Sequence, residues 1–436
     1  MCRRAATDSL DATIAVMCPE QPALTISGAG PRAVACALAM VLSVAGVARA
    51  QWPEFRGPSG QGHSSEQGLP LEWSETRNVV WKRPVPGRGW SSPVVAGSRV
   101  WLTTAVKASG GASLRAMAFA VDTGAPLVDV EVFRSRRGDA LNPKNSLASP
   151  TPIVEGDRVY VHFGQDGTAA LTAAGDIVWK TQLRYESQHG SGGSPVLYKD
   201  LLIINCDGAD DAYVAALDVN TGKVRWRTGR RMPFDQAYAT PLIVRVGDRD
   251  QLVSPGAYRA AAYDPLTGRE IWRVGYVDGF SNVPRPVAGH GLVYIATGFQ
   301  QPSLIAVRTD GTGDVTRSHV AWKISRGVPL TPSPLLVGDE LYFVSDGGVA
   351  SAVDARSGEV LWQHRLAGNF SASPVFVDGR IYFQSEEGIT TVLAPGREFR
   401  QLATSRIDGA TLASPAIAGR SFFLRSDSHL YRIAAQ

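Results

Sequence analysis

Near its middle the chain reads Asp218-Val219-Asn220-Thr221-Gly222-Lys223-Val224-Arg225-Trp226, which is an acid, a turn glycine and then a strand carrying a tryptophan. The phrase returns as Asp264-Pro265-Leu266-Thr267-Gly268 with Trp272, and as Asp354-Ala355-Arg356-Ser357-Gly358 with Trp362. Glycine suits the turn because it adopts a positive φ without steric cost. The recurrence predicts a chain built from one repeated unit.

A second phrase opens each unit: a residue before proline, the proline, a short apolar run and a glycine turn, as in Ser92-Pro93-Val94-Val95 with Gly97. Its prolines are Pro93, Pro152, Pro195, Pro241, Pro286, Pro334, Pro374 and Pro415. Consecutive copies lie 40–59 residues apart, and the longest interval is explained by apparent loop insertions at residues 107–114 and 131–147. Proline is tolerated at the first residue of a strand, so each copy marks a strand opening.

Four strands per unit at this period are typical of a propeller blade. The eighth copy ends near Tyr431-Arg432-Ile433 without its fourth strand, and Asn78-Val79-Val80-Trp81-Lys82 has the character of that strand. The sequence therefore predicts an all-β, eight-bladed propeller of four-stranded antiparallel blades, closed by an N-terminal strand. Seven or nine blades would require discarding a clear copy or inventing one. The recurrent tryptophans are expected to pack between blades rather than to bind a ligand; they are Trp81, Trp179, Trp226, Trp272, Trp322 and Trp362.

Three segments are expected. Residues 1–50 have the features of a signal peptide with an extended lead-in, because Arg32 precedes an apolar stretch that ends in Ala48-Arg49-Ala50. Residues 51–77 form an N-terminal lead-in segment, and residues 78–436 form the propeller. Cleavage would leave Gln51 as the first residue and no membrane span, which places the protein in the periplasm or outside the cell. An uncleaved anchor and a start at Met17 remain alternatives.

Composition narrows the function. Lys and Arg total 44 against 40 Asp and Glu, so the net charge is +4 and nothing indicates a nucleic-acid binder. Cys206 is the only cysteine after residue 50, which excludes an intrachain disulfide in the mature chain.

Together the two phrases resemble the pyrroloquinoline quinone (PQQ) repeat of the quinoprotein alcohol dehydrogenase-like superfamily, over residues 78–433. The opening Trp52-Pro53-Glu54-Phe55-Arg56-Gly57-Pro58 is similar to the lead-in of secreted bacterial members. The resemblance implies one of two branches: PQQ-dependent dehydrogenases, or BamB-like periplasmic propellers that bind no quinone.

The dehydrogenase branch implies a disulfide of adjacent cysteines, a calcium ion and an aspartate base. Cys206 is alone, and the densest acid cluster, Asp207, Asp210 and Asp211, is expected to be a solvated loop. No catalytic residue and no metal site is predicted, and no cofactor is firmly expected. PQQ with calcium is the alternative, with Trp90 stacking on the quinone and Arg285 or Lys144 pairing with its carboxylates.

Loops that join a fourth strand to the next first strand should converge on one mouth of the ring, as a concave site with a few polar groups. The residues expected to bind a ligand there are Arg88, Trp90, Lys144, Asn145, His189, Tyr238, Asn282, Arg285 and Asn369. The predicted function is a binding or scaffold module, expected to be a monomer, that holds an envelope protein or a small-molecule ligand at the channel face. The alternative is a PQQ-dependent alcohol or sugar dehydrogenase.

Overall fold

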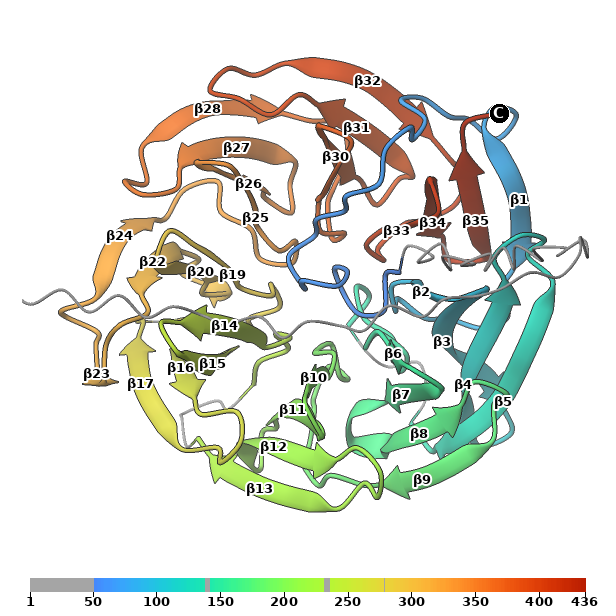
Figure 1. Ribbon diagram of the computed structural model, residues 1–436, viewed down its shortest axis with the longest axis horizontal. Coiled ribbons are helices and arrows are strands. Elements are labelled where there is room, and N and C mark those ends of the chain that lie inside the picture. The colour runs from blue at the N-terminus through green and yellow to red at the C-terminus, as the bar shows by residue number, and fades with distance from the viewer. Residues whose placement is uncertain (1–50, 138–141, 231–235, 278) are drawn as a thin grey trace, which may run out of the picture. The chain divides into compact units, whose positions relative to one another are not determined.

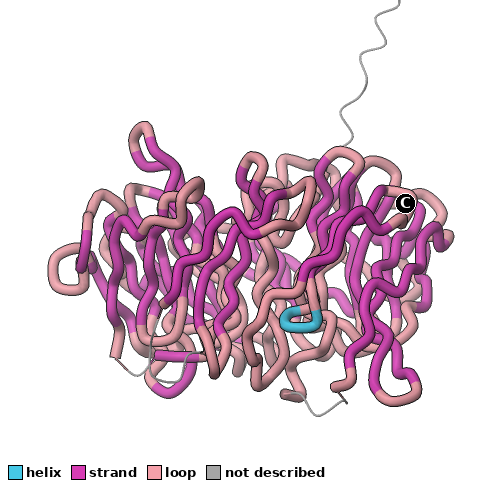
Figure 2. The backbone as a smooth tube through the Cα atoms, turned by 90° about the horizontal axis from the view of Figure 1, so that it is seen from below, coloured by secondary structure: helices cyan, strands magenta, loops and turns pink. Residues whose placement is uncertain are grey.

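Eight four-stranded antiparallel blades follow one another around a ring in the computed structural model (Figure 1). The structure describes residues 51–137, 142–230, 236–277 and 279–436, so the predicted signal peptide, residues 1–50, lies outside it. Figure 2 shows strands and loops throughout, with a single helical turn, η1 (Gly164–Asp166), in the described part of the chain. Nowhere in these residues is there a helix of the length and apolarity that a membrane crossing requires.

Each blade runs from an inner first strand to an outer fourth strand. Blade 1 consists of β2 (Val94–Ala96), β3 (Arg99–Ala108), β4 (Gly111–Ala120) and β5 (Pro126–Ser135), and blade 2 of β6 (Ile153–Glu155), β7 (Arg158–His162), β8 (Thr168–Thr172) and β9 (Ile177–Thr181). Blade 3 consists of β10 (Val196–Tyr198), β11 (Leu201–Asp207), β12 (Ala212–Asp218) and β13 (Val224–Gly229), and blade 4 of β14 (Leu242–Val246), β15 (Arg249–Pro255), β16 (Arg259–Tyr263) and β17 (Glu270–Gly275). Blade 5 consists of β19 (Val287–Gly289), β20 (Leu292–Ala296), β22 (Leu304–Arg308) and β24 (Val320–Ile324), and blade 6 of β25 (Leu335–Val337), β26 (Glu340–Val344), β27 (Val349–Asp354) and β28 (Val360–Arg365). Blade 7 consists of β29 (Val375–Val377), β30 (Arg380–Gln384), β31 (Ile389–Leu393) and β32 (Gln401–Arg406), and blade 8 of β33 (Ala416–Ala418), β34 (Ser421–Arg425), β35 (His429–Ala434) and β1 (Val79–Pro84).

The predicted closure of the ring is confirmed. β1 completes blade 8 by pairing antiparallel with β35, with Trp81 opposite Arg432 and Lys82 opposite Tyr431. All eight first strands begin directly after their proline, as expected for a residue that cannot donate to a strand ladder. Pairing the two ends of the propeller removes two unpaired sheet edges.

The prediction of loop insertions in blade 1 is partly wrong. Residues 107–114 extend the β3–β4 hairpin, whose strands have ten residues each, and residues 131–135 extend β5. Two short additions were not predicted: the β18–β21 pair (Gly279–Phe280 with Phe299–Gln300) and β23 (Gly313–Asp314), which adds in parallel to β17. They arise from longer connections that flank and interrupt blade 5.

The recurrent tryptophans pack between neighbouring blades, as predicted. Trp179 donates its indole N–H to the carbonyl oxygen of Val219 at 2.8 Å, and its ring lies against Gly222 in the turn of blade 3. Equivalent bonds run from Trp81 to Val121, Trp226 to Pro265, Trp322 to Ala355 and Trp362 to Gly396. Trp272 departs from the pattern by donating to Gln251 of its own blade. In the turns at Gly124, Gly222, Gly268 and Gly358, the glycine is therefore needed for space as well as for its φ.

Replacing Gly222 by alanine should destabilise the protein more than replacing Gly247. Both glycines have a positive φ, +68° and +58°, but an added methyl at Gly222 would lie 2.5 Å from the Trp179 ring, whereas nothing lies within 4 Å at Gly247. We expect a loss of about 1–2 kcal/mol for Gly247→Ala from the left-handed backbone alone. Gly222→Ala should lose roughly 1–3 kcal/mol more, because the ring must shift. Equal midpoints in urea denaturation would contradict a packing role for this turn.

Candidate ligand-binding site

A cavity of about 390 Å³ occupies the centre of the ring and opens where the fourth-to-first-strand loops converge. Its lining residues come from the lead-in segment and from loops of several blades: Phe55, Trp90, Ser92, Asn142, Lys144, Asn145, Ser149, Thr151, His189, Gly192, Ser194, Tyr238, Thr240, Phe280, Ser281, Val283, Phe299, Leu330, Thr331, Ser333, Asp346, Ser371, Ser373, Leu412 and Ser414. The volume suits a small molecule or a short peptide segment.

A ring of hydroxyl groups encircles the lower part of the cavity, by which we mean the part farther from its mouth. The hydroxyl ring comprises Ser92, Thr151, Ser194, Thr240, Ser333, Ser373 and Ser414, each directly before a repeat proline. Each hydroxyl accepts the backbone N–H of the equivalent residue in the preceding blade, at 2.9–3.1 Å. The bonds therefore tie neighbouring blades together at the channel wall. In the blade 5 copy this position is held by Arg285 instead of a hydroxyl residue.

Residues 52–64, which we call the plug, cross the channel below this ring. Trp52 forms an isolated antiparallel bridge with Val95, and Pro53 accepts the N–H of Val154 at 2.9 Å. On the other side, Gly62 accepts the N–H of Phe376 at 2.8 Å. The blue segment passes through the centre of the ring in Figure 1, and the plug thus pairs backbone groups on inner strands of three blades.

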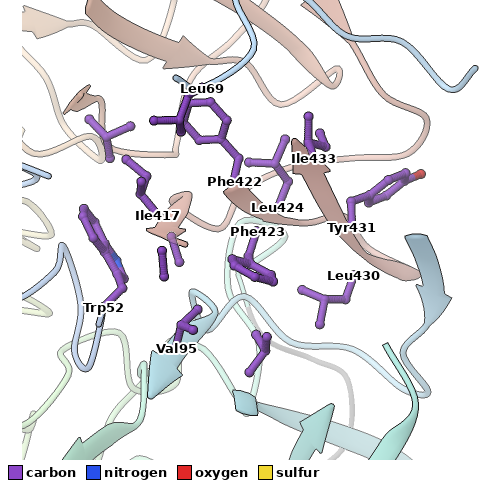
Figure 3. Packing of buried hydrophobic residues seen from close by; sticks show 14 of the residues in the cluster. Trp52, Leu69, Val95, Ile417, Phe422, Phe423, Leu424, Leu430, Tyr431 and Ile433 are labelled. Carbon is purple, nitrogen blue, oxygen red and sulfur yellow. The ribbon is translucent and has the colours of Figure 1, made fainter. Parts of the chain in front are cut away.

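Trp52 fixes the start of the plug by burying its whole side chain. It belongs to a core cluster with Val95, Ile417 and Phe422, shown in close-up in Figure 3. Burial of an aromatic side chain of this size stabilises the segment by roughly 1.5–3 kcal/mol. The plug is therefore part of the folded core rather than a tail.

Arg285 anchors the plug from beneath the cavity. Its guanidinium donates to the carbonyl of Phe55 at 2.5 Å and to that of Pro241 at 3.1 Å, and it lies 3.3 Å from a carboxylate oxygen of Glu54. The Phe55 side chain then lines the floor of the cavity. Arg56 donates to the carbonyls of Pro334 and, less closely, Pro374, at 2.7 and 3.4 Å.

Lys144 reaches across the mouth from the loop between blades 1 and 2. Its Nζ lies 3.3 Å from Oδ2 of Asp346 in blade 6 and 2.8 Å from Oε1 of Glu386 in blade 7. Burial acts to lower the pKa of Lys144, but the hydrogen bond to Glu386 and the charge of Asp346 outweigh it, so the pKa is raised. Asp346 also accepts the N–H groups of Leu330 and Thr331. Both mouth carboxylates are therefore already engaged.

The upper wall is aromatic. The rings of Phe280 and Phe299, on β18 and β21, meet edge to face with centroids 5.7 Å apart. The ring centroids of Tyr238 and His189 lie 6.3 Å apart. Burial raises the pKa of Tyr238 to about 12, so its side chain stays a neutral phenol. Trp90 completes this surface. The cavity thus offers flat apolar faces above a ring of polar hydroxyls.

Five of the nine predicted residues meet at this cavity: Trp90, Lys144, Asn145, His189 and Tyr238. Asn145 also orders the wall, since its Nδ2 donates to the carbonyl of His189 at 2.7 Å. Sequence reasoning missed Phe55, Phe280, Phe299 and Asp346. It also did not single out the serines and threonines before the prolines, whose hydroxyls form the ring.

The other four predicted residues do not line the cavity. Arg88 is exposed and donates to the carbonyl of Pro143 at 2.6 Å, while exposed Asn369 donates to Glu387 at 3.1 Å. Asn282 is buried and donates to the Tyr276 hydroxyl at 2.7 Å. Arg285 turns away from the mouth to hold the plug, because the carbonyls and carboxylate of the plug face it.

The acid cluster in the third blade is only partly a solvated loop. Asp210 and Asp211 are exposed, as expected, but Asp207 is 3% exposed and forms a buried ion pair with Arg230. The Nε of Arg230 donates to Oδ1 of Asp207 at 2.7 Å. The prediction of solvation is therefore wrong for Asp207, whose charge is compensated inside the protein.

The donor groups of the cavity do not fit calcium and PQQ. Calcium takes several oxygen ligands, and in the described residues no group of three or more His, Cys, Asp or Glu side chains is arranged to hold a metal. Asp346 and Glu386 share the Lys144 ammonium instead. Cys206 is a buried free thiol whose pKa is raised by burial. Arg285, the other expected partner of the quinone carboxylates, is occupied by Glu54.

Comparison with known proteins agrees with the fold. The structure of BamB from Moraxella catarrhalis has a TM-score of 0.58 at 15% identity, covering 82% of this chain and 97% of that one. A europium-containing methanol dehydrogenase has a TM-score of 0.60 at 12% identity, covering 87% of this chain and 90% of that one. At such identities these similarities show the fold alone, and a search of curated protein sequences finds no match. The family described as outer membrane protein assembly factor BamB matches residues 76–251 and 210–436. Since these matches span the whole propeller, the chain belongs to this family of PQQ-repeat β-propellers.

Proposed function

We propose that the protein is a non-catalytic binding module that holds a small ligand or a short protein segment in the central cavity. The observation that carries this proposal is the plug, whose Phe55 closes the floor of the cavity while the mouth stays lined by loops. A channel closed at one end forms a concave pocket, which can bury most of the surface of a small ligand. Aromatic walls with a few converging polar groups are what ligand sites share.

The proposal also includes the partner and the cellular location of the protein. The family description refers to assembly of outer membrane proteins, which supports an envelope protein as partner and a periplasmic or secreted location. The dehydrogenase alternative receives no support from the donor groups, since the mouth carboxylates are bound by Lys144 and no further acids join them in the described residues.

Filling the cavity should weaken the binding of an apolar probe. Prodan, a neutral naphthalene dye, should bind one to one with a fluorescence increase. Leu412→Trp places a larger side chain in the cavity lining and should weaken binding by about tenfold or more, because roughly 1.4 kcal/mol of apolar contact is lost. The titration is read by dye fluorescence.

Val360→Trp is the matched control, because Val360 lies on the exposed outer strand β28, 47% exposed. It should leave the dissociation constant unchanged. Circular dichroism checks that both variants fold. Absence of saturable binding to the wild-type protein, or equal binding by both variants, would refute the central cavity as the binding site.

A further inference from the structure

Positive charge is in excess around the cavity floor. Arg56, Arg285 and Arg425 are among the largest fully buried side chains, each at most 2% exposed. In the described part of the chain, Glu54 is the only carboxylate that pairs with any of them, and it pairs with Arg285. Burial and the charge of Arg285 lower the pKa of Arg56 to about 9, and burial alone lowers that of Arg425 to about 9. Both remain protonated at neutral pH, so the surplus charge persists.

These arginines do not line the cavity but hydrogen-bond to residues that line it or lie next to lining residues in the chain. Arg285 bonds to the carbonyl of Phe55, whose side chain forms the floor, and Arg56 is the next residue along the plug. Arg425 donates to the Ser91 hydroxyl at 2.7 Å and to the carbonyl of Thr103 at 2.8 Å. Ser91 lies between the lining residues Trp90 and Ser92. Buried charge without a counter-charge is costly, and an anion in the cavity would relieve part of that cost.

The hydroxyl ring points to the same ligand. In the described structure its seven hydroxyls act only as acceptors, each from a backbone N–H. Each hydroxyl keeps one proton to donate, because a hydroxyl is one donor and two acceptors. Seven O–H donors are therefore available to a ligand along the cavity wall. Hydrogen bonds to an ionised acceptor are stronger than those to a neutral one.

The upper half of the cavity has a different character. Trp90, Tyr238, Phe280 and Phe299 present aromatic surface, and the Lys144 ammonium compensates part of the charge of the mouth carboxylates. A ligand that fits both halves has one anionic end and one flat apolar body.

We propose that the ligand is a small monocarboxylate with an aromatic or apolar body, seated with its carboxylate toward the hydroxyl ring and its body against the aromatic wall. This inference rests on the proposed function and names its ligand class. The carboxylate accepts hydrogen bonds from the ring and compensates the charge of the buried arginines behind the lining residues.

The test compares two probes of the same shape. Calorimetric titration of the wild-type protein should show 2-naphthoate binding about tenfold or more tightly than neutral 2-naphthamide, as expected for hydrogen bonds to a charged group. Equal affinities for the two probes, with prodan still bound, would overturn the carboxylate assignment while leaving the binding function intact. Failure of all three probes would overturn both.

Two variants locate the effect. Arg425→Met removes a buried cation that does not line the cavity and should weaken naphthoate binding severalfold without changing naphthamide binding. Trp90→Leu should weaken both probes alike, because it removes aromatic surface. Loss of both probes in Arg425→Met, in a protein that retains wild-type circular dichroism, would contradict an electrostatic role. If this variant does not fold, the comparison of the two probes on wild-type protein decides.

Two kinds of ligand carry such a carboxylate, a polypeptide with a free C-terminus and a free small acid, and a competition experiment distinguishes them. Displacement of naphthoate by the peptide alanyl-alanyl-phenylalanine, but not by its C-terminal amide, would assign the acid to the end of a polypeptide. Selective naphthoate binding without displacement would assign it to a free small acid. Displacement by the amide as readily as by the acid would contradict recognition of a carboxylate.

Discussion

Replacing Arg285 by methionine should lower the free energy of unfolding by about 3–5 kcal/mol, the cost of leaving a buried ion-pair partner alone. The side chain is 2% exposed, and its loss would leave Glu54 without its cation and remove the donor to the carbonyls of Phe55 and Pro241. The plug would lose its main anchor. Equilibrium urea denaturation measures the effect.

A second substitution separates charge from packing. Glu54→Gln in the Arg285→Met background removes the stranded carboxylate and should recover part of the lost stability. Arg249→Met serves as the control, because Arg249 is 80% exposed and its nearest acid is also exposed, so the midpoint should not move. A midpoint for Arg285→Met as high as that of this control would show that the plug does not depend on the pair.

Replacing Trp81 by alanine should cost about 3–5 kcal/mol, as for other large-to-small changes in a core. Trp81 is 5% exposed, donates to the carbonyl of Val121 at 2.9 Å and lies against Gly124 in blade 1. It also contacts Phe423 of blade 8, with ring centroids 6.0 Å apart. The substitution therefore weakens the one interface where the two ends of the propeller meet.

Val80 offers a matched control on the same strand. Its side chain is 40% exposed, since successive residues of a strand face opposite sides. Val80→Ala should leave the urea midpoint nearly unchanged. A small effect of Trp81→Ala, comparable with that of Val80→Ala, would show that ring closure relies on the β1–β35 backbone ladder alone.

The fold could be predicted because its signals are local and repeated. Each proline marks a strand opening through its missing N–H, and each turn glycine precedes a strand that carries an aromatic residue in most copies. The copies therefore support one another. The closing strand was predictable for the same reason, because Trp81 carries the character of the tryptophan that blade 8 lacks. These features depend on residues within a few positions of one another.

The site was less predictable because it depends on contacts between distant residues. Nothing near Arg285 in the chain shows that Glu54 and Phe55 lie beneath it, since the contact spans 231 residues. One signal was present: Arg285 stands where seven other copies have serine or threonine before the proline. A residue that departs from the repeat in this way indicates a role that the other copies do not have, here the anchoring of the plug. The aromatic pair Phe280 and Phe299 had no such signal, because it lies in irregular connections of blade 5.

The joining of Val79 to Ile433 also sets the order in which the protein can fold during synthesis. Blade 8 acquires its outer strand, and the core cluster of Trp52 acquires Ile417 and Phe422, only when the last residues have emerged from the ribosome. Until then residues 52–84 have no complete surface to bury themselves against. Contacts of such high sequence separation slow folding and leave apolar segments exposed meanwhile. The nascent chain is therefore expected to stay open until translation ends, a state suited to capture by chaperones.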